Sequence, residues 1–266
     1  MAIKNTNSAW DKVTIARLST RPHADFYIKE IFDNFIELHG DRCYGDDSAI
    51  ISGIAYLKGT PVTVIAVAKG SSTKENIKRN FGMVKPEGYR KALRLMKQAE
   101  KFKRPVICIV DTPGAFCGVE AEKNGQGYAI AQNLFQMSNL KTPIIAVMAG
   151  EGGSGGALGL AVADKIFMLS NSIYSVLSPE GFASILWKDT ERTKEAAEVM
   201  KITAQDLKGF NVIDEIIEEP KGGAHNDPEK MAADIKAVLV EAVKELRDVA
   251  VDKLLEKRYQ KFRKIK

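Results

Sequence analysis

The chain contains 266 residues, of which 45% are hydrophobic and 27% are charged, and its formal net charge is +5. This composition is ordinary for a globular protein and fits one large α/β domain or two small ones. The first 11 residues are polar, and no apolar run approaches the roughly 20 residues of a membrane-spanning helix. We therefore expect no secretory signal, no membrane partner and a cytoplasmic protein.

The first part of the chain is expected to form a helix, a strand pair, a second helix and a third strand. Apolar residues from Phe26 to Leu38 recur at helical spacing and predict a helix over Pro22–His39 that ends at Gly40. The other expected elements are strands over Ala49–Leu57 and Val62–Ala68 joined at 59–61, a basic connection over Ser71–Pro86, a helix over Pro86–Phe102 and a buried strand over Val106–Val110.

The second part alternates short strands with helices. A loop is expected over Asp111–Phe116, followed by a helix over Glu122–Met137, a strand over Pro143–Ala149, a glycine turn over Gly150–Gly156 and a helix from Ala157. Two further strands are expected over Lys165–Leu169 and Ile173–Val176. The remaining helices are expected over Pro179–Trp187, Glu191–Met200, Ala204–Lys208 with Thr203 as its cap, and Asp227 to about Lys257. The alternation from 49 to 200 predicts one α/β unit with a largely parallel sheet.

The positive charge is concentrated at the C-terminal end of the chain. Its basic residues there are Lys253, Lys257, Arg258, Lys261, Arg263, Lys264 and Lys266. Seven basic residues against the single acid Glu256 give this segment a charge of +6 and leave about −1 for the rest. No body-wide basic face is available for a nucleic acid. We interpret the segment as the solvated end of a helix, with its cations placed favourably for the helix dipole, and a site for a polyanion is the lesser alternative.

The three cysteines are Cys43, Cys108 and Cys117. They are odd in number and widely spaced, so they predict neither a disulfide framework nor a zinc site. Cys108 lies in an apolar run and is expected in the core, whereas Cys117 lies in a loop, where a reactive thiol is an alternative to a plain surface residue.

The segment Gly150–Gly156 is the most informative part of the sequence. It follows the apolar run 143–149 and precedes a second apolar run, which suits a buried strand, a glycine turn and a helix start. Glycines let the backbone approach a ligand closely, and a helix start presents unpaired N–H groups. Together they predict a site for an oxyanion that is bound or that develops during a reaction.

Two alternative motifs occur in these loops. Asp111–Gly114 has the DxxG form of GTPases, but the sequence has no GxxxxGK[ST] phosphate loop, which rejects that interpretation. Gly152–Gly156 fits G-x-S-x-G, the nucleophile elbow of serine hydrolases. The other triad members would be His225 and one aspartate among Asp164, Asp189, Asp206 and Asp214. His225 lies in a glycine-rich loop expected at the surface, and the glycine content favours backbone approach over a fixed nucleophile, so the hydrolase is the lesser hypothesis.

The remaining pattern is rich in backbone donors and poor in acid–base side chains. The loops 111–118 and 150–156 both follow buried strands, and open α/β sheets place their ligands at the carboxyl ends of such strands. A site of this kind suits a reaction whose main difficulty is the stabilisation of an enolate or a similar oxyanion.

Several long motifs resemble one protein family. They are ELHGDR (37–42), the stretch 74–102 that begins KENIKRNFGMVKPEGYR, DTPGAF (111–116), GEGGSGGAL (150–158), SPEGFASILWK (178–188), AAEVMKITAQDLK (196–208) and GGAHNDPEKMA (222–232). In this order they resemble the α subunits of bacterial acetyl-CoA carboxylase carboxyltransferase, and the likeness extends from about residue 30 to residue 235.

This resemblance implies an α/β fold of the crotonase-like (ClpP/crotonase) type, built from repeated ββα units with an N-terminal helix and a long C-terminal helix. It implies a single carboxyltransferase domain over 1–266, in which 1–48 is an N-terminal helical segment, 49–218 the crotonase-like core and 219–266 the C-terminal helix and basic tail.

The resemblance also implies an activity and its partners. The family moves a carboxyl group from carboxybiotin, borne on a biotin carboxyl carrier protein, to acetyl-CoA, giving malonyl-CoA in the first committed step of fatty acid biosynthesis. The site lies between the α and β subunits of an α2β2 heterotetramer, biotin carboxylase belongs to the wider complex, and zinc is bound by the β subunit only. We therefore expect this chain to be inactive alone.

The family likeness gives the glycines specific roles. Gly155 and Gly156 are expected to donate backbone N–H groups, and Gly152 and Gly153 to shape the turn. The donors would stabilise either the ureido oxyanion of biotin or the thioester enolate, with biotin favoured. A biotin ureido anion left after loss of CO2 could itself take the acetyl proton, so no protein base is required.

Substrate contacts are expected from the neighbouring loop and from a basic stretch. Gly114, Ala115 and Phe116 would line the same cavity, whereas Lys74, Lys78, Arg79 and Arg90 are candidates for contacts with CoA or the carrier. A solvated surface explains the four basic residues equally well. A non-catalytic partner that only completes a cavity is a further alternative for the chain as a whole.

Overall fold

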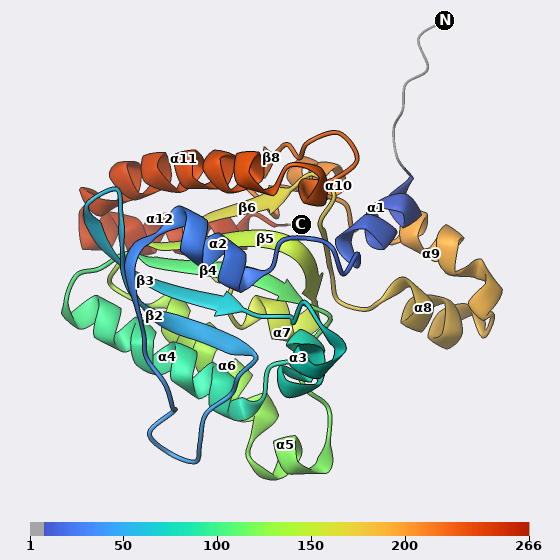
Figure 1. The fold of residues 1–266 in the computed structure, drawn as a ribbon, viewed down its shortest axis with the longest axis horizontal. Coiled ribbons are helices and arrows are strands. Elements are labelled where there is room, and N and C mark those ends of the chain that lie inside the picture. The colour runs from blue at the N-terminus through green and yellow to red at the C-terminus, as the bar shows by residue number, and fades with distance from the viewer. Residues whose placement is uncertain (1–7, 266) are drawn as a thin grey trace, which may run out of the picture.

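A mixed sheet of eight strands organises the computed structural model, which describes residues 8–265 (Figure 1). The strands are β1 (Asp33–Glu37), β2 (Ile50–Leu57), β3 (Thr60–Val67), β4 (Val106–Thr112), β5 (Ile144–Gly153), β6 (Lys165–Leu169), β7 (Ile173–Ser175) and β8 (Glu215–Ile217). Their order is β1-β2-β3-β4-β5-β6-β8, and β7 pairs with β5 beside β6. The β1–β2 and β2–β3 pairs are antiparallel and the others parallel, which confirms the predicted largely parallel sheet.

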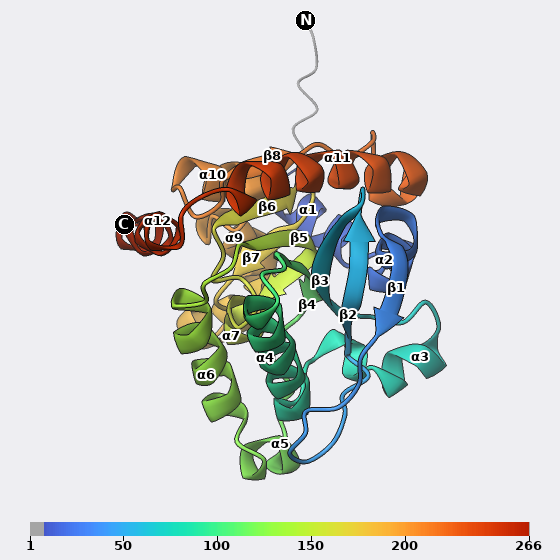
Figure 2. The ribbon, with the colours of Figure 1, turned by 90° about the vertical axis from the view of Figure 1, so that its left-hand side faces the viewer.

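Helices cover both faces of the sheet (Figure 2). They are α1 (Ala9–Ala16), α2 (Ala24–Ile31), α3 (Thr73–Lys78), α4 (Pro86–Lys101), α5 (Val119–Lys123), α6 (Gln126–Ser138), α7 (Ser154–Leu158), α8 (Pro179–Phe182), α9 (Thr193–Val199), α10 (Ala204–Gly209), α11 (Pro228–Arg247) and α12 (Val251–Arg263), with single turns at 80–82, 183–187, 190–192 and 224–226. Helices α4 and α6 pack on one face, and α2 and α11 on the other.

The central strands alternate their side chains between these two layers. Cys108 and Val110 of β4 face α4 and α6, whereas Ile107 and Ile109 face α2 and α11. A strand covered on both sides reads as a continuous apolar run, which is why β4 was predictable. Cys108 is fully buried as expected, and burial raises the pKa of its thiol to about 12.

The predicted helix over Pro22–His39 is wrong beyond its first half. Helix α2 ends at Ile31, and the chain continues as the edge strand β1. Asn34 has a left-handed φ of 52°, which an α-helix does not accommodate. Pairing with β2 then satisfies the backbone of β1, and it brings the strands so close that a Cβ at Gly53 would overlap the carbonyl of Ile36. Tertiary pairing therefore overrides the helical spacing of the apolar residues.

The glycine turn expected over Gly150–Gly156 is wrong, because β5 continues to Gly153 and α7 begins directly at Ser154. Several other elements agree with the prediction, and the differences arise at breaks. The strand over Lys165–Leu169 and the Thr203 cap of α10, which forms a capping box, are confirmed. The helix expected over 122–137 is interrupted before α6 by Gly125, whose φ is 81°. The long terminal helix divides into α11 and α12 around residues 248–250.

The basic C-terminal segment is not uniformly solvated, which corrects one expectation. Arg258 on α12 is only 1% exposed, and its guanidinium binds the carboxylate of Asp164 at 2.7–2.8 Å. The same group donates to the carbonyl oxygens of Met137, Leu140 and Thr142. Arg258 therefore links α12 to the end of α6 and the start of β5 through its hydrogen bonds, and its charge does not face solvent.

Among residues 8–265, no helix combines the length and the apolar character that a membrane crossing requires. Within the same range, no three His, Cys, Asp or Glu side chains converge in a way that could hold a metal ion.

Candidate functional site

Strand β5 changes its neighbours halfway along its length. Its first half pairs with β6, and its last residues, Glu151–Gly153, pair with β7. On the other side Val110 pairs with Met148, whereas Thr112 pairs with Gly152, so the register with β4 shifts between these pairs. Figure 1 shows β5 curving toward α7 at this end. The curve brings the last residues of β5 beside the loop that follows β4.

The two predicted loops meet at this point. A Cβ on Gly153 would overlap the carbonyl oxygen of Pro113, and a Cβ on Gly156 would lie 2.5 Å from the amide nitrogen of Ala115. The hydroxyl of buried Tyr89 on α4 donates to the carbonyl of Gly156 at 3.0 Å. These contacts require glycine at 153 and 156, and they fix the distance between the two loops.

Helix α7 begins directly after this contact. Its N-cap is Gly153, which has no side chain to satisfy the amides of the first turn, and those amides have no partner within a helix. Gly155 and Gly156 both lie in that turn. A Cβ on Gly155 would meet only Ile130, at 3.7 Å, so the backbone is approachable on that side. The arrangement can stabilise a negative oxygen with main-chain donors.

Two pockets adjoin these residues and share Ser154. One measures about 70 Å³ and is lined by Arg17, Pro113, Glu151, Gly152, Gly153, Ile173, Ser175, Val176, Leu177 and Ser178. The other measures about 370 Å³ and is mostly apolar, with Gly155, Leu158, Tyr174, Ser175, Val176, Leu207 and Val212. Polar donors beside an apolar wall suit a ligand that has a small polar group on an apolar ring or chain.

A buried ionic network lies behind the glycines, and sequence reasoning missed it. Lys69 Nζ binds Asp111 Oδ1 at 2.7 Å and Glu151 Oε2 at 2.9 Å. Burial alone would raise the pKa of Asp111, but the charge of Lys69 holds that pKa well below its ordinary value. Burial likewise would lower the pKa of Lys69, and the attraction of both carboxylates raises it instead. A lone lysine directly after the apolar run 62–68 was the available signal.

Arg17, at the end of α1, extends the network outward. Its Nε binds Glu151 at 2.7 Å, and its Nη1 binds Glu180 of α8 at 2.6 Å. Figure 1 shows α8 and α9 projecting beside the sheet, so Arg17 joins this projecting part to the glycine segment. Nothing local in the sequence connects residue 17 with residues 151 and 180.

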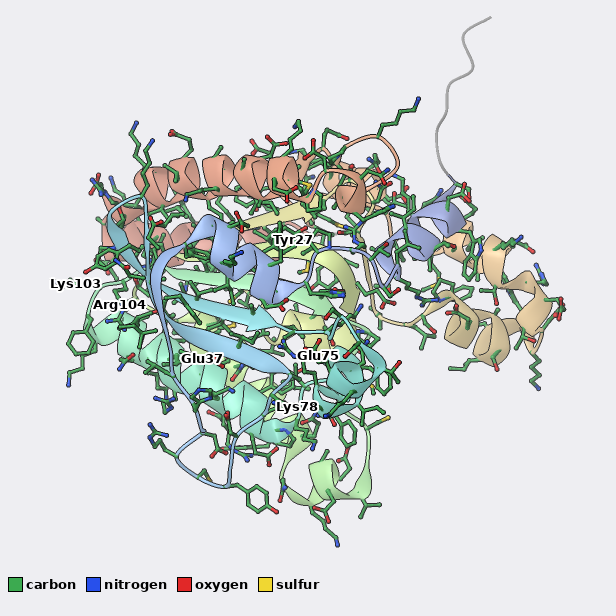
Figure 3. All side chains as sticks on the ribbon, in the orientation of Figure 1. Tyr27, Glu37, Glu75, Lys78, Lys103 and Arg104 are labelled. Carbon is green, nitrogen blue, oxygen red and sulfur yellow. The ribbon has the colours of Figure 1, made fainter. Side chains whose placement is uncertain are left out.

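The predicted basic residues have different surroundings. Lys74 and Lys78 are exposed on α3, where Figure 3 labels Lys78 and Glu75. The turn after α3 approaches the site, since a Cβ on Gly82 would lie 3.1 Å from the carbonyl of Asp111. Arg79, which links α3 to this turn, has one buried nitrogen, Nη1, without a hydrogen-bond partner.

Arg90, the fourth predicted basic contact, has internal partners instead. Its guanidinium binds the carboxylate of Asp41 at 2.7 Å and the carbonyl of Asn124 at 2.8 Å. Among the predicted lining residues, Phe116 is half-buried, and Lys85 Nζ lies 5.5 Å from the centroid of its ring. Cys117 next to it is exposed.

The structure does not assemble the serine triad. Ser154 has the left-handed φ of 52° that an elbow would require, but no histidine lines either described pocket that it borders. Each aspartate proposed for the triad has another partner: Asp164 binds Arg258, Asp189 caps residue 191, Asp206 caps α10 and Asp214 binds Lys261. The hydrolase hypothesis therefore has no geometric support.

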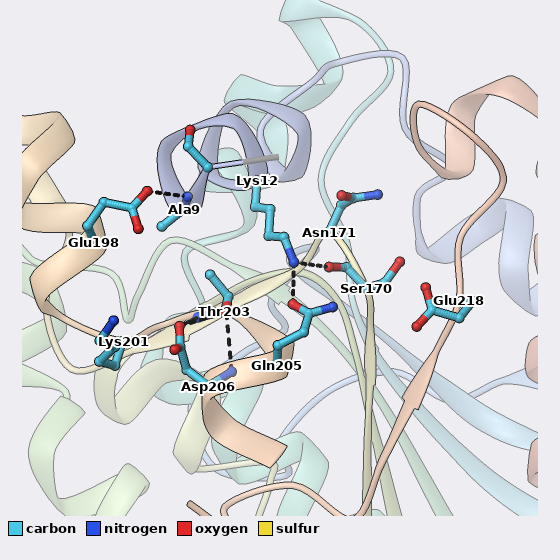
Figure 4. Close-up of a pocket in the computed structure, with 11 residues that line it drawn as sticks. Ala9, Lys12, Ser170, Asn171, Glu198, Lys201, Thr203, Gln205, Asp206 and Glu218 are labelled. Carbon is cyan, nitrogen blue, oxygen red and sulfur yellow. Dashed lines mark hydrogen bonds between the residues drawn. The ribbon is translucent and has the colours of Figure 1, made fainter. Parts of the chain in front are cut away.

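A larger polar pocket lies elsewhere, between α1, α9 and α10 (Figure 4). It measures about 540 Å³, and Lys12 donates there to the carbonyl of Ser170 and to Gln205. None of the residues that line it belongs to the two glycine-bearing loops. The candidate site is therefore the junction of β4, β5 and α7.

Comparison with known proteins adds independent findings. The sequence profile of the family described as acetyl co-enzyme A carboxylase carboxyltransferase-like matches residues 2–266. The chain is 68% identical over 260 residues to the acetyl-coenzyme A carboxylase carboxyl transferase subunit alpha of Clostridium perfringens strain ATCC 13124, which covers 98% of this chain and 96% of that protein. It is 58% identical over 263 residues to the subunits beta/alpha protein of Clostridium tetani strain E88, covering 99% of this chain and 46% of that one.

A solved structure shares the fold at much lower identity. The transcarboxylase 12S crystal structure, with methylmalonyl-coenzyme A and methylmalonic acid bound, superposes with a TM-score of 0.70 at 18% identity. The match covers 92% of this chain and 46% of the transcarboxylase chain. This chain therefore spans about half the length of the transcarboxylase chain. At this identity the likeness concerns the fold alone, and it confirms the predicted crotonase-like architecture.

Proposed function

The chain belongs to the family of acetyl-coenzyme A carboxylase carboxyltransferase α subunits, and from this premise we propose that it moves a carboxyl group from carboxybiotin to acetyl-CoA. The product is malonyl-CoA, the first committed intermediate of fatty acid biosynthesis. The observation that carries the proposal is the junction of two glycine-bearing loops, where the first-turn amides of α7 stand beside Ala115. Such donors suit a reaction that passes through an oxyanion.

The residues of this chain have defined tasks in the proposed reaction. Carboxybiotin, carried by another protein, supplies the activated carboxyl group. The amides of Gly155 and Gly156 donate to the oxyanion, for which the biotin ureido oxygen is favoured over the thioester enolate. Gly152 and Gly153 let β5 approach β7 and Pro113 closely enough to aim those amides. Gly114, Ala115 and Phe116 line neither of the two pockets, and we propose that they complete the site from the facing loop.

The apolar pocket supports this assignment by its chemistry. It lies directly beside Gly155, and leucine, valine and tyrosine side chains dominate its lining. A bicyclic ring with one polar ureido edge would place its apolar part against that wall and its oxygen toward the amides. No side-chain base is needed if the ureido nitrogen takes the proton from the acetyl group.

The proposed assembly is an α2β2 heterotetramer with a zinc-binding β subunit, served by a biotin carboxyl carrier protein and biotin carboxylase. The relative from C. tetani, named as subunits beta/alpha, supports a β partner for this chain. A site shared between the subunits explains why one chain contributes main-chain donors and few acid–base side chains. We therefore expect the isolated chain to be inactive.

The decisive experiment is the reverse half-reaction, malonyl-CoA decarboxylation in the presence of free biotin. The purified chain, the purified β partner and their mixture are compared, and assembly is verified by gel filtration. We expect turnover only in the mixture. A folded, assembled complex without turnover would contradict the carboxyltransferase function. A complex that keeps full turnover when Gly155 and Gly156 are replaced by bulky residues would reduce this chain to a non-catalytic partner.

The basic helix α3 is proposed to contact one of the two substrates, the CoA ester or the carrier protein. Reversing two exposed charges with the double variant Lys74→Glu/Lys78→Glu should raise one KM several-fold and leave kcat unchanged, because rim charges act mainly on association. The KM of malonyl-CoA rises if α3 contacts CoA phosphates, and the KM of the carrier protein rises if α3 contacts the carrier. Lys244→Glu on α11 is the control, and an unchanged pair of KM values would assign α3 to the solvated surface.

A further inference from the structure

Lys69 lies at the back of both loops that carry the proposed donors. It follows β3, and its ammonium group lies 2.7 Å from Asp111 Oδ1 and 2.9 Å from Glu151 Oε2. Asp111 belongs to β4 and precedes the loop that ends in Ala115, whereas Glu151 belongs to β5 and precedes the glycines. The three side chains are 15%, 9% and 11% exposed. One buried cation therefore connects the two strands that the site depends on.

We propose that Lys69 is a positioning residue that fixes the spacing between the Asp111 and Glu151 segments and thereby aims the donors of both loops. It acts through these two segments. This inference rests on the proposed carboxyltransferase function, since it names a residue that sets the rate of that reaction.

The backbone around Lys69 leaves these groups little freedom. Asp111 Oδ1 also accepts a hydrogen bond from the amide of Glu151 at 2.9 Å. The same oxygen therefore binds both the ammonium group of Lys69 and the backbone of β5. A Cβ on Gly150 would overlap the Asp111 carboxylate, and one on Gly82 would lie 2.9 Å from Lys69 Cγ. Main chain therefore contacts the lysine stem and the aspartate on one side, and on the other side both groups line a pocket of about 230 Å³ with Arg17, His23 and Glu151.

Charge balance gives the network its second constraint. The carboxylates of Asp111 and Glu151 face Lys69, and Arg17 also binds Glu151 at 2.7 Å. The His23 ring lies 3.9 Å from Asp111 Oδ2, and neither of its buried nitrogens has a hydrogen-bond partner.

More distant charges also act on this cluster. Arg21, paired with Glu219, and the hydroxyl of Tyr27 interact with Asp111 over longer range, and Glu180 neutralises the outer side of Arg17. Without the ammonium group of Lys69, two buried carboxylates would share one guanidinium, and their repulsion would separate β4 from β5.

Small displacements at such a site have large kinetic effects. Donors stabilise an oxyanion only over a short range of distance and angle, and a shift of about 1 Å can cost about 10²-fold in rate. The amides of α7 and the Ala115 loop derive their mutual position from the segments that Lys69 connects. Loss of the cation should therefore act on kcat, because the donors matter most in the transition state.

The test compares Lys69→Met, Asp111→Asn and the double variant in the assembled complex with the β subunit. We expect Lys69→Met to lower kcat of biotin-dependent malonyl-CoA decarboxylation by about 10- to 100-fold with little change in KM. The double variant should regain much of that loss, because it restores the charge balance and the side-chain amide oxygen introduced by Asp111→Asn can still accept the backbone N–H of Glu151.

The pH profile separates positioning from a general structural role. Removing Lys69 removes the main influence that lowers the pKa of Asp111, so the Asp111 carboxylate should take up a proton in mildly acidic buffer and restore the balance. Activity of Lys69→Met should therefore rise as the pH falls, relative to the wild type. The thermal stability deficit of Lys69→Met should shrink over the same range, which is a readout independent of activity.

Lys97→Met, an exposed lysine change on α4, is the matched control. The inference is overturned if Lys69→Met keeps its kcat per assembled complex, or if its loss is equal in the double variant and at every pH. Failure of the proposed function looks different, because the wild-type complex would then be inactive while the pH dependence of the unfolding temperatures still reports on the network.

Discussion

Replacing Gly156 with alanine is expected to lower kcat of the assembled complex by about 10²- to 10³-fold, the loss typical of one misplaced oxyanion donor. A Cβ at this position would lie 2.5 Å from the Ala115 amide and 2.6 Å from the Gly114 carbonyl carbon. Both are backbone atoms of the opposing loop, so no side chain can rotate out of the way. The methyl group must therefore push apart the two segments that carry the proposed donors.

The measurement is kcat of biotin-dependent malonyl-CoA decarboxylation, normalised to complex that has been isolated by gel filtration. Gly127→Ala in α6 is the matched control, since a Cβ there meets nothing within 4 Å. Gly155→Ala should fold at least as stably as the wild type, because its nearest neighbours are side-chain atoms of Ile130 at 3.7 Å or more. A Gly156→Ala complex with wild-type kcat would show that the two loops do not need their close contact for the reaction.

Replacing Arg258 with methionine is expected to destabilise the chain by about 3–5 kcal/mol, the usual cost of removing one partner of a buried ion pair. The Asp164 carboxylate, whose side chain is 4% exposed, would lose its cation. The carbonyls of Met137, Leu140 and Thr142 would lose their donors at the same time. For a chain of this size the unfolding temperature should fall by about 10 °C.

Thermal unfolding of the isolated chain checks this expectation. Lys257→Met, an exposed neighbour on α12, is the control and should remain within about 0.5 kcal/mol of the wild type. Adding Asp164→Asn to Arg258→Met should recover part of the loss, because the uncompensated charge is then removed. An unfolding temperature for Arg258→Met equal to that of the control would mean that α12 contributes little to the stability of the body.

The parts of the fold that were predictable depend on short stretches of sequence. Val106–Val110 is an apolar run long enough for a strand and too short for a helix, and the strand over 165–169 matches the structure at both ends. Thr203 and Asp206 form a capping box within four residues of each other. Such signals do not depend on the rest of the chain.

The parts that were not predictable depend on distant partners. The edge strand β1 has the apolar spacing of a helix and becomes a strand because β2 offers it a ladder. Arg258 belongs to a basic run that looks solvated, and its partner Asp164 lies 94 residues away. No window of sequence contains both members of such a pair.

The candidate site divides in the same way. Two loops after neighbouring parallel strands were expected to meet, and Gly153 does approach Pro113 while Gly156 approaches Ala115. The roles of these residues in carboxyl transfer stay predictions. The ionic network behind them was missed, because Lys69, Asp111 and Glu151 come from three different strands or strand ends, and only the parallel order of β3, β4 and β5 brings them together.

The proposed site, with the first-turn amides of α7 as its donors, has consequences for how it can be detected. Amide N–H groups do not ionise in the range where enzymes work, and group-specific reagents that label thiols, imidazoles or carboxylates find no target among them. An alanine scan removes side chains and leaves every amide in place, so it reports on the scaffold around the donors and passes over the donors themselves. Replacing single peptide bonds by esters, which deletes one N–H at a time, is the chemical experiment that addresses this kind of active site directly.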